Sequence, residues 1–401
     1  METFRVFDIQ WPPASGPVFW VSVCLVLAGV IGELGLRYLH LPRVAGYVAT
    51  GLAAGAFGVG LIDARLPAAA QIVLDLALAV LLFEAGSRIS LRWLRSNPWL
   101  LGYCLLESLL SFVAVLGVLH WLGAPGHVSV PLAAIAMATS PAVLLRVASE
   151  YGAAGQVTER MIVMSGVNTC LAVLASRFVG GWLMHEAGGD GWNAIALPFY
   201  QLAGSLVLAA LLAGAVIVLA RRVDLRNEHA KVLVIGLVLL ALSLASIVQA
   251  SSLLVPLLAG LMLKNLSKRA GSGPGPSGTA GVVLVLMLFV TTGAAWSPEL
   301  IAAGGGLALA LIVARQAAKM AAAIALAGPS GLSLRQGTAL GLTGLPLSAP
   351  ALVMYANLNA FAPAYAGQIG SVLVSAVAFV ELAGPIVVRA ALHWVREGDV
   401  R

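Results

Sequence analysis

Long apolar runs recur along the whole chain, and each is about as long as a segment that crosses a membrane. A helix needs ~20 mainly apolar residues to span a hydrocarbon core of ~30 Å. This criterion predicts about thirteen spans, at residues 16–36, 42–62, 67–86, 98–122, 128–149, 158–183, 193–220, 230–249, 251–264, 279–296, 299–326, 334–356 and 367–392. The pattern indicates an all-α polytopic membrane protein that forms a single membrane unit over residues 1–401.

The composition supports this interpretation. The chain is 60% hydrophobic and 10% charged, and its mean hydropathy is +0.97. In soluble proteins about a quarter of all residues are charged, so the composition excludes an ordinary soluble enzyme and a nucleic-acid-binding domain. The net charge of +6 then points to cytoplasmic loops, and we expect the lipid bilayer, not nucleic acid, as a partner.

The positions of lysine and arginine predict the orientation in the membrane. If the N-terminus is outside, most of the 23 lysine and arginine residues fall in alternate loops and in the C-terminal tail. Arg5 and Arg65 fall on the opposite side. Because cytoplasmic loops carry the excess of positive charge, we expect the N-terminus outside and the C-terminus inside a bacterial-type inner membrane.

Two predicted spans carry helix breakers at matching places. The fifth contains AIAMATSPAVLLRV, with Pro141 in mid-span, and the twelfth contains ALGLTGLPLSAPALVMY, with Pro346 and Pro350. Proline interrupts a helix, and unwound backbone at this depth is tolerated only when it is buried or lines a cavity. The two spans are seven apart in order, as two six-helix repeats separated by one linker helix require. We therefore predict two inverted six-helix repeats with a linker helix. The two broken helices would cross and form a site near the middle of the membrane.

Small polar residues and two cations are predicted to lie at this crossing. They are Thr139, Ser140, Ser165, Asn168, Thr169, Arg315 and Lys319. Arg315 and Lys319 are four residues apart and share one helical face. Ionisable residues inside a membrane mark a functional site by default. The alternative is that the polar residues only pack helices together and that the cations belong to a structural ion pair.

Several segments share the order and spacing of one known family. They include LPRVAGYVATGLAAGAFGVGLI, LDLALAVLLFEAG, ATSPAVLLRVASEYGAAGQVTERMIVMSGVNTCLAVL and VARQAAKMAAA. In these segments the chain resembles the monovalent cation:proton antiporter superfamily. The resemblance implies a homodimeric exchanger of a monovalent cation for protons, with elevator-type alternating access. It also implies a dimerisation domain at 1–97 and 230–296, a core transport domain at 98–183 and 299–396, and a linker helix at 193–220.

The resemblance breaks where the family carries its acids. Ser140 replaces the aspartate of a Thr-Asp-Pro motif, Thr169 replaces the last residue of an Asn-Asp or Asp-Asp pair, and Met164 replaces a glutamate of one branch. Arg315 and Lys319, in contrast, match the two basic positions that different branches use. We therefore expect a site that has lost its usual acids and kept its bases.

Two unpaired cations near the midplane would cost of the order of several kcal/mol each, so we expect something to balance them. One solution is a surviving acid. Glu107, at the repeat position that mirrors the eleventh span, and Glu381, in the thirteenth span, are the candidates. For Glu381 we favour a structural role, paired with Arg389. Loss of the Lys319 proton is a second solution, and an anion bound at the half-helix N-termini is a third.

Three functional hypotheses follow from these observations. The first is cation:proton exchange, the second is an anion or uncoupled carrier that uses Arg315 and Lys319, and the third is a non-transporting membrane sensor or subunit. The sequence contains no nucleophile–base pair, cofactor motif or phosphate-binding loop, and its cysteines and histidines form no metal-ligand pattern. We therefore expect a transporter and not an enzyme, with no cofactor and no bound metal.

Overall fold

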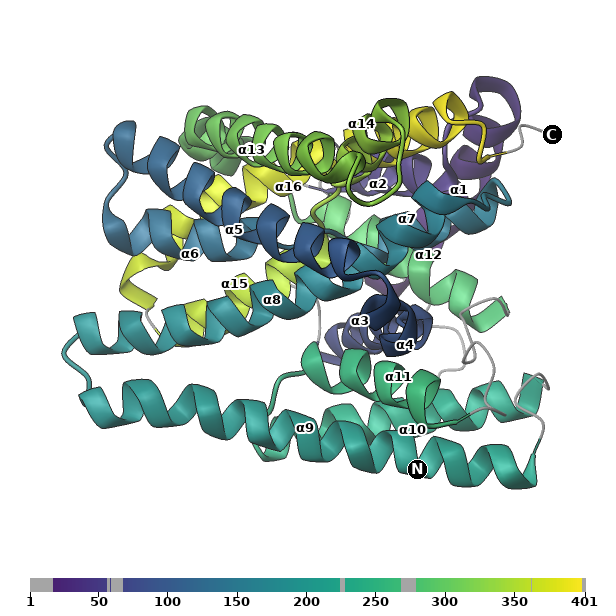
Figure 1. Cartoon of the computed structure of the whole chain (residues 1–401), viewed down its shortest axis with the longest axis horizontal. Coiled ribbons are helices and arrows are strands. Elements are labelled where there is room, and N and C mark those ends of the chain that lie inside the picture. The colour runs from purple at the N-terminus through teal and green to yellow at the C-terminus, as the bar shows by residue number, and fades with distance from the viewer. Residues whose placement is uncertain are drawn as a thin grey trace, which may run out of the picture.

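The computed structural model describes residues 17–55, 58, 68–223, 228–267, 279–361 and 363–398, and these residues are almost entirely helical, with no strand among them (Figure 1). The helices are α1 (Pro17–Leu39), α2 (Arg43–Ala54), α3 (Ala68–Arg88), α4 (Leu91–Ser96), α5 (Pro98–Trp121), α6 (Gly126–Ala136), α7 (Pro141–Glu150), α8 (Gln156–Glu186), α9 (Gly191–Arg222), α10 (Glu228–Ile247), α11 (Leu254–Leu266), α12 (Thr279–Ala294), α13 (Pro298–Ala327), α14 (Leu334–Thr343), α15 (Ala349–Phe361), the short 3₁₀ turn η1 (Pro363–Tyr365) and α16 (Ala366–Trp394). The predicted all-α class is confirmed. Arg5 and Arg65 lie outside the described residues.

Eight segments of the described chain are long and apolar enough to cross a membrane. They are Phe19–Leu39, Pro98–Trp121, Gly126–Glu150, Gln156–Glu186, Gly191–Arg222, His229–Ile247, Pro298–Ala327 and Pro363–Trp394. Leu254–Leu266 and Gly281–Ala294 are shorter apolar helices. The protein is therefore a multi-pass membrane protein, while the number of thirteen crossings stays a prediction.

Both predicted helix breaks are present. The first separates α6 from α7 at residues 137–140, and the second separates α14 from α15 at residues 344–348. Ser140 adopts an extended backbone and its hydroxyl caps α7, which begins at Pro141. This is expected because proline disfavours helix in the residue before it and has no N–H to donate in a first turn.

The two breaks lie against each other. The backbone N–H of Ser140 donates to the carbonyl of Pro346 over 3.0 Å. The Ser140 and Ser348 hydroxyl oxygens are 2.5 Å apart. One backbone hydrogen bond and one hydroxyl contact thus join the two breaks, and both lie buried in protein, as irregular backbone at membrane depth requires.

The packing of the helices repeats between the two halves of the chain. Helix α5 packs on α13, α2 on α12, and α3 on α11. In the last two pairs glycines allow the backbones to approach closely, and a Cβ on Gly86 or Gly260 would collide with the partner backbone. Small residues permit such contacts between membrane helices. These reciprocal pairings fit the predicted inverted repeat.

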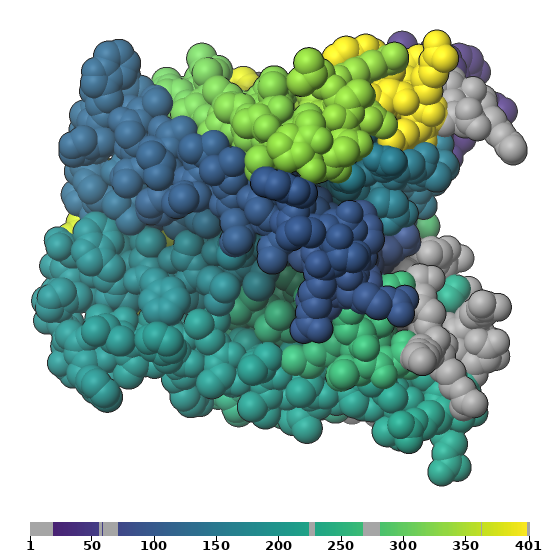
Figure 2. Space-filling model, viewed as in Figure 1, coloured from purple at the N-terminus to yellow at the C-terminus, as the bar shows by residue number. Residues whose placement is uncertain are grey.

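Most helix contacts fall within two groups, which also contact each other directly through α2 and α16 and through α3, α7 and α8. One contains α5 to α8 and α13 to α16, and the other contains α1 to α3 and α10 to α12. Helix α9 touches both, through α8 and α11. It runs with α10 along the edge of the molecule opposite α13 and α14 (Figure 1), and in the space-filling view the teal surface of α9 lies along that edge (Figure 2). The two breaks therefore lie inside the first group.

Candidate functional site

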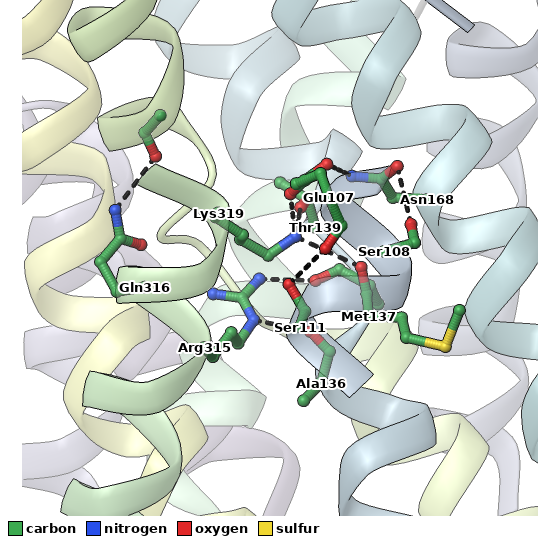
Figure 3. Close-up of polar contacts among 12 residues, drawn as sticks. Glu107, Ser108, Ser111, Ala136, Met137, Thr139, Asn168, Arg315, Gln316 and Lys319 are labelled. Atoms are coloured by element: carbon green, nitrogen blue, oxygen red, sulfur yellow. Dashed lines mark hydrogen bonds and ion pairs between the residues drawn. The ribbon is translucent and has the colours of Figure 1, made fainter. Parts of the chain in front are cut away.

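Helix α13 carries the two buried cations into the region of the breaks. Arg315 and Lys319 are 1% and 0% exposed, and they lie one turn apart on the face that meets α5 and the breaks (Figure 3). Ser297 caps the start of this helix by accepting from the N–H of Leu300. The sequence of α13 around both cations is rich in alanine, a small residue that allows the neighbouring backbones to come close.

The Arg315 guanidinium binds backbone carbonyls from both breaks. Nε donates to Ala136 O at 2.8 Å, Nη1 to Leu345 O at 2.8 Å, and Nη2 to Ala138 O at 2.5 Å and Pro346 O at 3.4 Å. The carbonyls at a helix C-terminus carry partial negative charge and lack intrahelical partners. The charged side chain of Arg315 therefore supplies hydrogen-bond donors to the carbonyl groups at the ends of α6 and α14.

Lys319 forms an ion pair with Glu107 of α5. Its ammonium nitrogen donates to Glu107 Oε1, to Thr139 Oγ1 at 3.0 Å and to Met137 O at 3.3 Å (Figure 3). An ammonium group has three donors, and all three are used here. Of the three ways to balance the buried cations, the geometry thus presents the surviving acid, because both side chains are 0% exposed and paired with each other.

Glu107 is also connected to α8. Its second carboxylate oxygen accepts from Asn168 Nδ2, and Asn168 Oδ1 accepts from the Ser108 hydroxyl at 3.1 Å (Figure 3). A buried carboxylate is stabilised when each of its oxygens receives a hydrogen bond. The result is one continuous polar network of Lys319, Glu107, Asn168 and Ser108 across three helices.

The other predicted site residues lie at different places around this network. Thr169 donates its hydroxyl proton to Thr139 O at 3.0 Å, which ties α8 to the first break. Ser140 contacts Ser348, as described above. Ser165 is buried but donates to Ile162 O of its own helix at 2.8 Å, and within the described part of the chain no hydrogen bond joins its side chain to the network.

Three contributors to the site did not emerge from the sequence. Met137 contributes only a carbonyl, and Ser108 is visible only as the neighbour of Glu107. Ser348 could have been found from the repeat. It follows Ser140 by 208 residues, and Arg315 follows Glu107 by the same number of residues. Repeat arithmetic applied to Ser140 would therefore have found Ser348.

A cavity of about 470 Å³ opens between the two helix groups, near the start of α3, the end of α12 and the first part of α15. Polar groups on its wall include Asp75, Gln71, Thr291 and Asn357. Its lining reaches Ala349, which is the neighbour of Ser348 in the second break. The cavity thus extends from one end of the bundle to the edge of the crossing.

Comparisons with known proteins agree with this architecture. The family described as the transmembrane sodium/hydrogen exchanger matches residues 22–394. One solved structure of the sodium proton antiporter MjNhaP1 from Methanocaldococcus jannaschii, at pH 8, superposes with a TM-score of 0.66 at 18% identity, over 95% of both chains. An electron-microscopy structure of MjNhaP1 gives a TM-score of 0.71 at 18% identity, over 96% of this chain and 99% of that one. The chain therefore belongs to the sodium/hydrogen exchanger family, within the monovalent cation:proton antiporter superfamily that its motifs resemble.

Proposed function

We propose that this protein exchanges a monovalent cation for protons, and that the Lys319–Glu107 pair is the place where the two compete. The buried ion pair carries the proposal. It supplies one group that can lose a proton and one carboxylate that can bind a cation, both enclosed at the crossing.

The surroundings of the ammonium group suit a cation in its place. The three atoms that accept from Lys319 are carboxylate, hydroxyl and carbonyl oxygens, from Glu107, Thr139 and Met137. Oxygens of these kinds are the usual ligands of hard cations. A cation that takes this position displaces the ammonium group. Desolvation and the nearby positive charge then favour release of the Lys319 proton.

The charge balance favours exchange over simple uptake. With the proton bound, the pair consists of a positive Lys319 and a negative Glu107. With the cation bound, Glu107 stays negative and Lys319 is neutral, so the total is unchanged. One proton leaves for each cation that enters, and the carboxylate comes from α5 instead of the usual positions, which Ser140 and Thr169 occupy here.

We infer the larger-scale mechanism from the same arrangement. The core transport domain would comprise 98–183 and 299–396, and the dimerisation domain 1–97 and 230–296, with 193–220 as the linker. An elevator-type movement of the first domain would carry the crossing past the second. The cavity between the two helix groups supports this, because it offers access from one end. A homodimer in an inner membrane, with the N-terminus outside, completes the proposal.

The contacts do not favour an anion carrier. Arg315 gives four hydrogen bonds to carbonyls, and the donors of Lys319 are also taken. An anion clamp needs donors that are free to turn toward the ligand. A non-transporting sensor or subunit is instead an outcome of the experiment below.

Purified protein in proteoliposomes should exchange cations for protons. We expect the internal fluorescence of a pH dye to change when Na⁺, K⁺ or Li⁺ is added outside, between pH 6 and 9, and the response to saturate with cation. Empty liposomes are the control. Absence of a response to all three ions over this range would contradict exchange and would favour the non-transporting alternative.

Asp75 should increase the local concentration of cations in the cavity. Replacing one partly solvated charge changes a nearby cation's energy by roughly 0.5–1 kcal/mol, which is about two- to fivefold in binding. We therefore expect Asp75→Asn to raise the KM for the cation by about this factor, with kcat nearly unchanged. Glu186→Gln removes an exposed acid that does not line the cavity and should leave KM unchanged. Equal KM values in both variants would rule out this role.

A further inference from the structure

Glu381 is a buried acid that takes no part in the network described above. It lies in the middle of α16 and is 0% exposed. Among the described residues, neither of its carboxyl oxygens has a hydrogen-bond partner. The predicted partner Arg389 lies two turns away, about 12 Å along the helix, and its guanidinium carbon is instead 5.2 Å from the ring centre of Tyr151. The expected Glu381–Arg389 pair is therefore wrong.

No other charged group in the described part of the chain compensates for Glu381. The elements that pack against α16 are α2, α6, α7, α13, α14, α15 and η1. Their charged or titratable side chains are Arg43, Tyr47, His127, Arg146, Glu150, Glu299, Arg315, Lys319, Arg335, Tyr355 and Tyr365, and α16 itself adds His393. Since both carboxyl oxygens are without a partner, none of these side chains forms an ion pair or hydrogen bond with Glu381.

Glu381 nevertheless lies close to the crossing. A Cβ on Gly384 would be 3.1 Å from Pro346 Cγ, so α16 touches the second break at this point. Glu381 precedes Gly384 by three residues and lies on nearly the same face of the helix. The carbonyl of Pro346 in turn accepts from Ser140 and Arg315. About one helical turn thus separates Glu381 from the contacts that hold the breaks together.

A lone carboxylate in the hydrocarbon region is strongly unfavourable, so Glu381 is a neutral acid in this state. Even a neutral carboxyl group without a partner is destabilising, because its hydroxyl and carbonyl have lost water without replacement. Glutamine or leucine would fill a purely structural position without this ability to ionise. We propose that Glu381 is a second proton-binding site of the exchange cycle, protonated in this conformation and deprotonated when the core domain gives it access to water.

This inference rests on the proposed function and changes its stoichiometry. Lys319 releases one proton from Nζ when a cation binds to Glu107, and Glu381 releases a second from its carboxyl group. Two protons then move in one direction for each monovalent cation in the other. One net positive charge crosses the membrane in every cycle, whereas exchange through Lys319 alone would be electroneutral.

The reversal point of transport measures this ratio directly. Proteoliposomes are held at zero membrane potential with a tenfold proton gradient. The flux of Na⁺ is then measured while the Na⁺ gradient is varied. If K⁺ or Li⁺ is transported faster than Na⁺, that ion is used instead. We expect net flux of the wild-type protein to vanish at a hundredfold cation gradient. Glu381→Gln cannot release the second proton, and its flux should vanish at a tenfold gradient. Glu381→Asp keeps a carboxyl group and should balance at a hundredfold gradient again.

The outcomes separate this inference from the proposed function. A wild-type balance point at a tenfold gradient would overturn the second proton site and leave exchange through Lys319 intact. An unchanged hundredfold balance point in Glu381→Gln would overturn it as well. Loss of all transport in both the glutamine and the aspartate variants would mean a structural role for Glu381 and would also overturn it. Absence of exchange in the wild-type protein would contradict the proposed function itself.

Discussion

Replacement of Glu107 by glutamine should reduce proton-coupled cation flux by at least about 100-fold, because it removes the carboxylate for which the cation and Lys319 compete. A 100-fold loss corresponds to roughly 2.7 kcal/mol of lost transition-state stabilisation. Breaking a buried ion pair by removing one partner typically also costs about 3–5 kcal/mol in stability. Initial rates of dye response in proteoliposomes, normalised to the amount of inserted protein, would measure the loss of flux.

Two controls separate the loss of charge from the loss of structure. Glu107→Gln combined with Lys319→Met removes both charges together, and we expect it to restore thermal stability in detergent but not transport. Glu84→Gln replaces another buried acid, which pairs with Arg88 on α3 outside the crossing, and it should retain most of the flux. If Glu107→Gln alone kept more than a tenth of the wild-type rate, the exchange site would lie elsewhere.

Replacement of Arg315 by methionine should destabilise the protein and stop transport. The change leaves the carbonyls of Ala136, Ala138 and Leu345 buried without a strong donor, and each such group costs about 1–3 kcal/mol. We expect a total loss of about 3 kcal/mol or more in unfolding free energy, since both breaks lose the same cation. Thermal unfolding in detergent and flux in proteoliposomes would measure the two effects.

Matched variants show whether these effects belong to the breaks. Arg315→Lys keeps the charge but not the planar arrangement of donors, and we expect an intermediate stability. Arg177→Met removes another buried arginine, whose side chain bonds to Gln201 Oε1 at 3.0 Å on α9, and it should destabilise the protein much less. A melting temperature for Arg315→Met equal to that of Arg177→Met would contradict a special role at the breaks.

Much of the fold could be predicted because membrane helices leave local signals. Apolar length predicted the helices, and prolines at matching depth predicted both breaks. The positions of Arg315 and Lys319 were predictable for the same reason, because ionisable residues are rare in apolar spans and stand out. The short helix α4 and the exact ends of α2 and α11 were not predicted, since short segments leave only weak periodic signals.

The partners within the site were less predictable. Three solutions to the buried positive charge were open from the sequence, and Glu107 was one candidate among them. Ser165 was grouped with the site because it lies three residues before Asn168, yet its hydroxyl donates to the carbonyl of Ile162 in its own helix. Glu381 was expected beside Arg389, but the two residues lie about 12 Å apart along α16, and the Arg389 guanidinium lies over the Tyr151 ring instead.

By itself, the sequence determined that this chain is a helical membrane protein with two interrupted spans and two intramembrane cations, because hydrophobic length, proline and charge act locally. Only the tertiary structure decided that Lys319 meets Glu107, that Arg315 binds carbonyls of both breaks, and that Glu381 has no partner among the described residues. These pairings join residues up to about two hundred positions apart in the chain. They depend on the angles and depths at which helices cross, and the packing of the whole bundle sets those quantities.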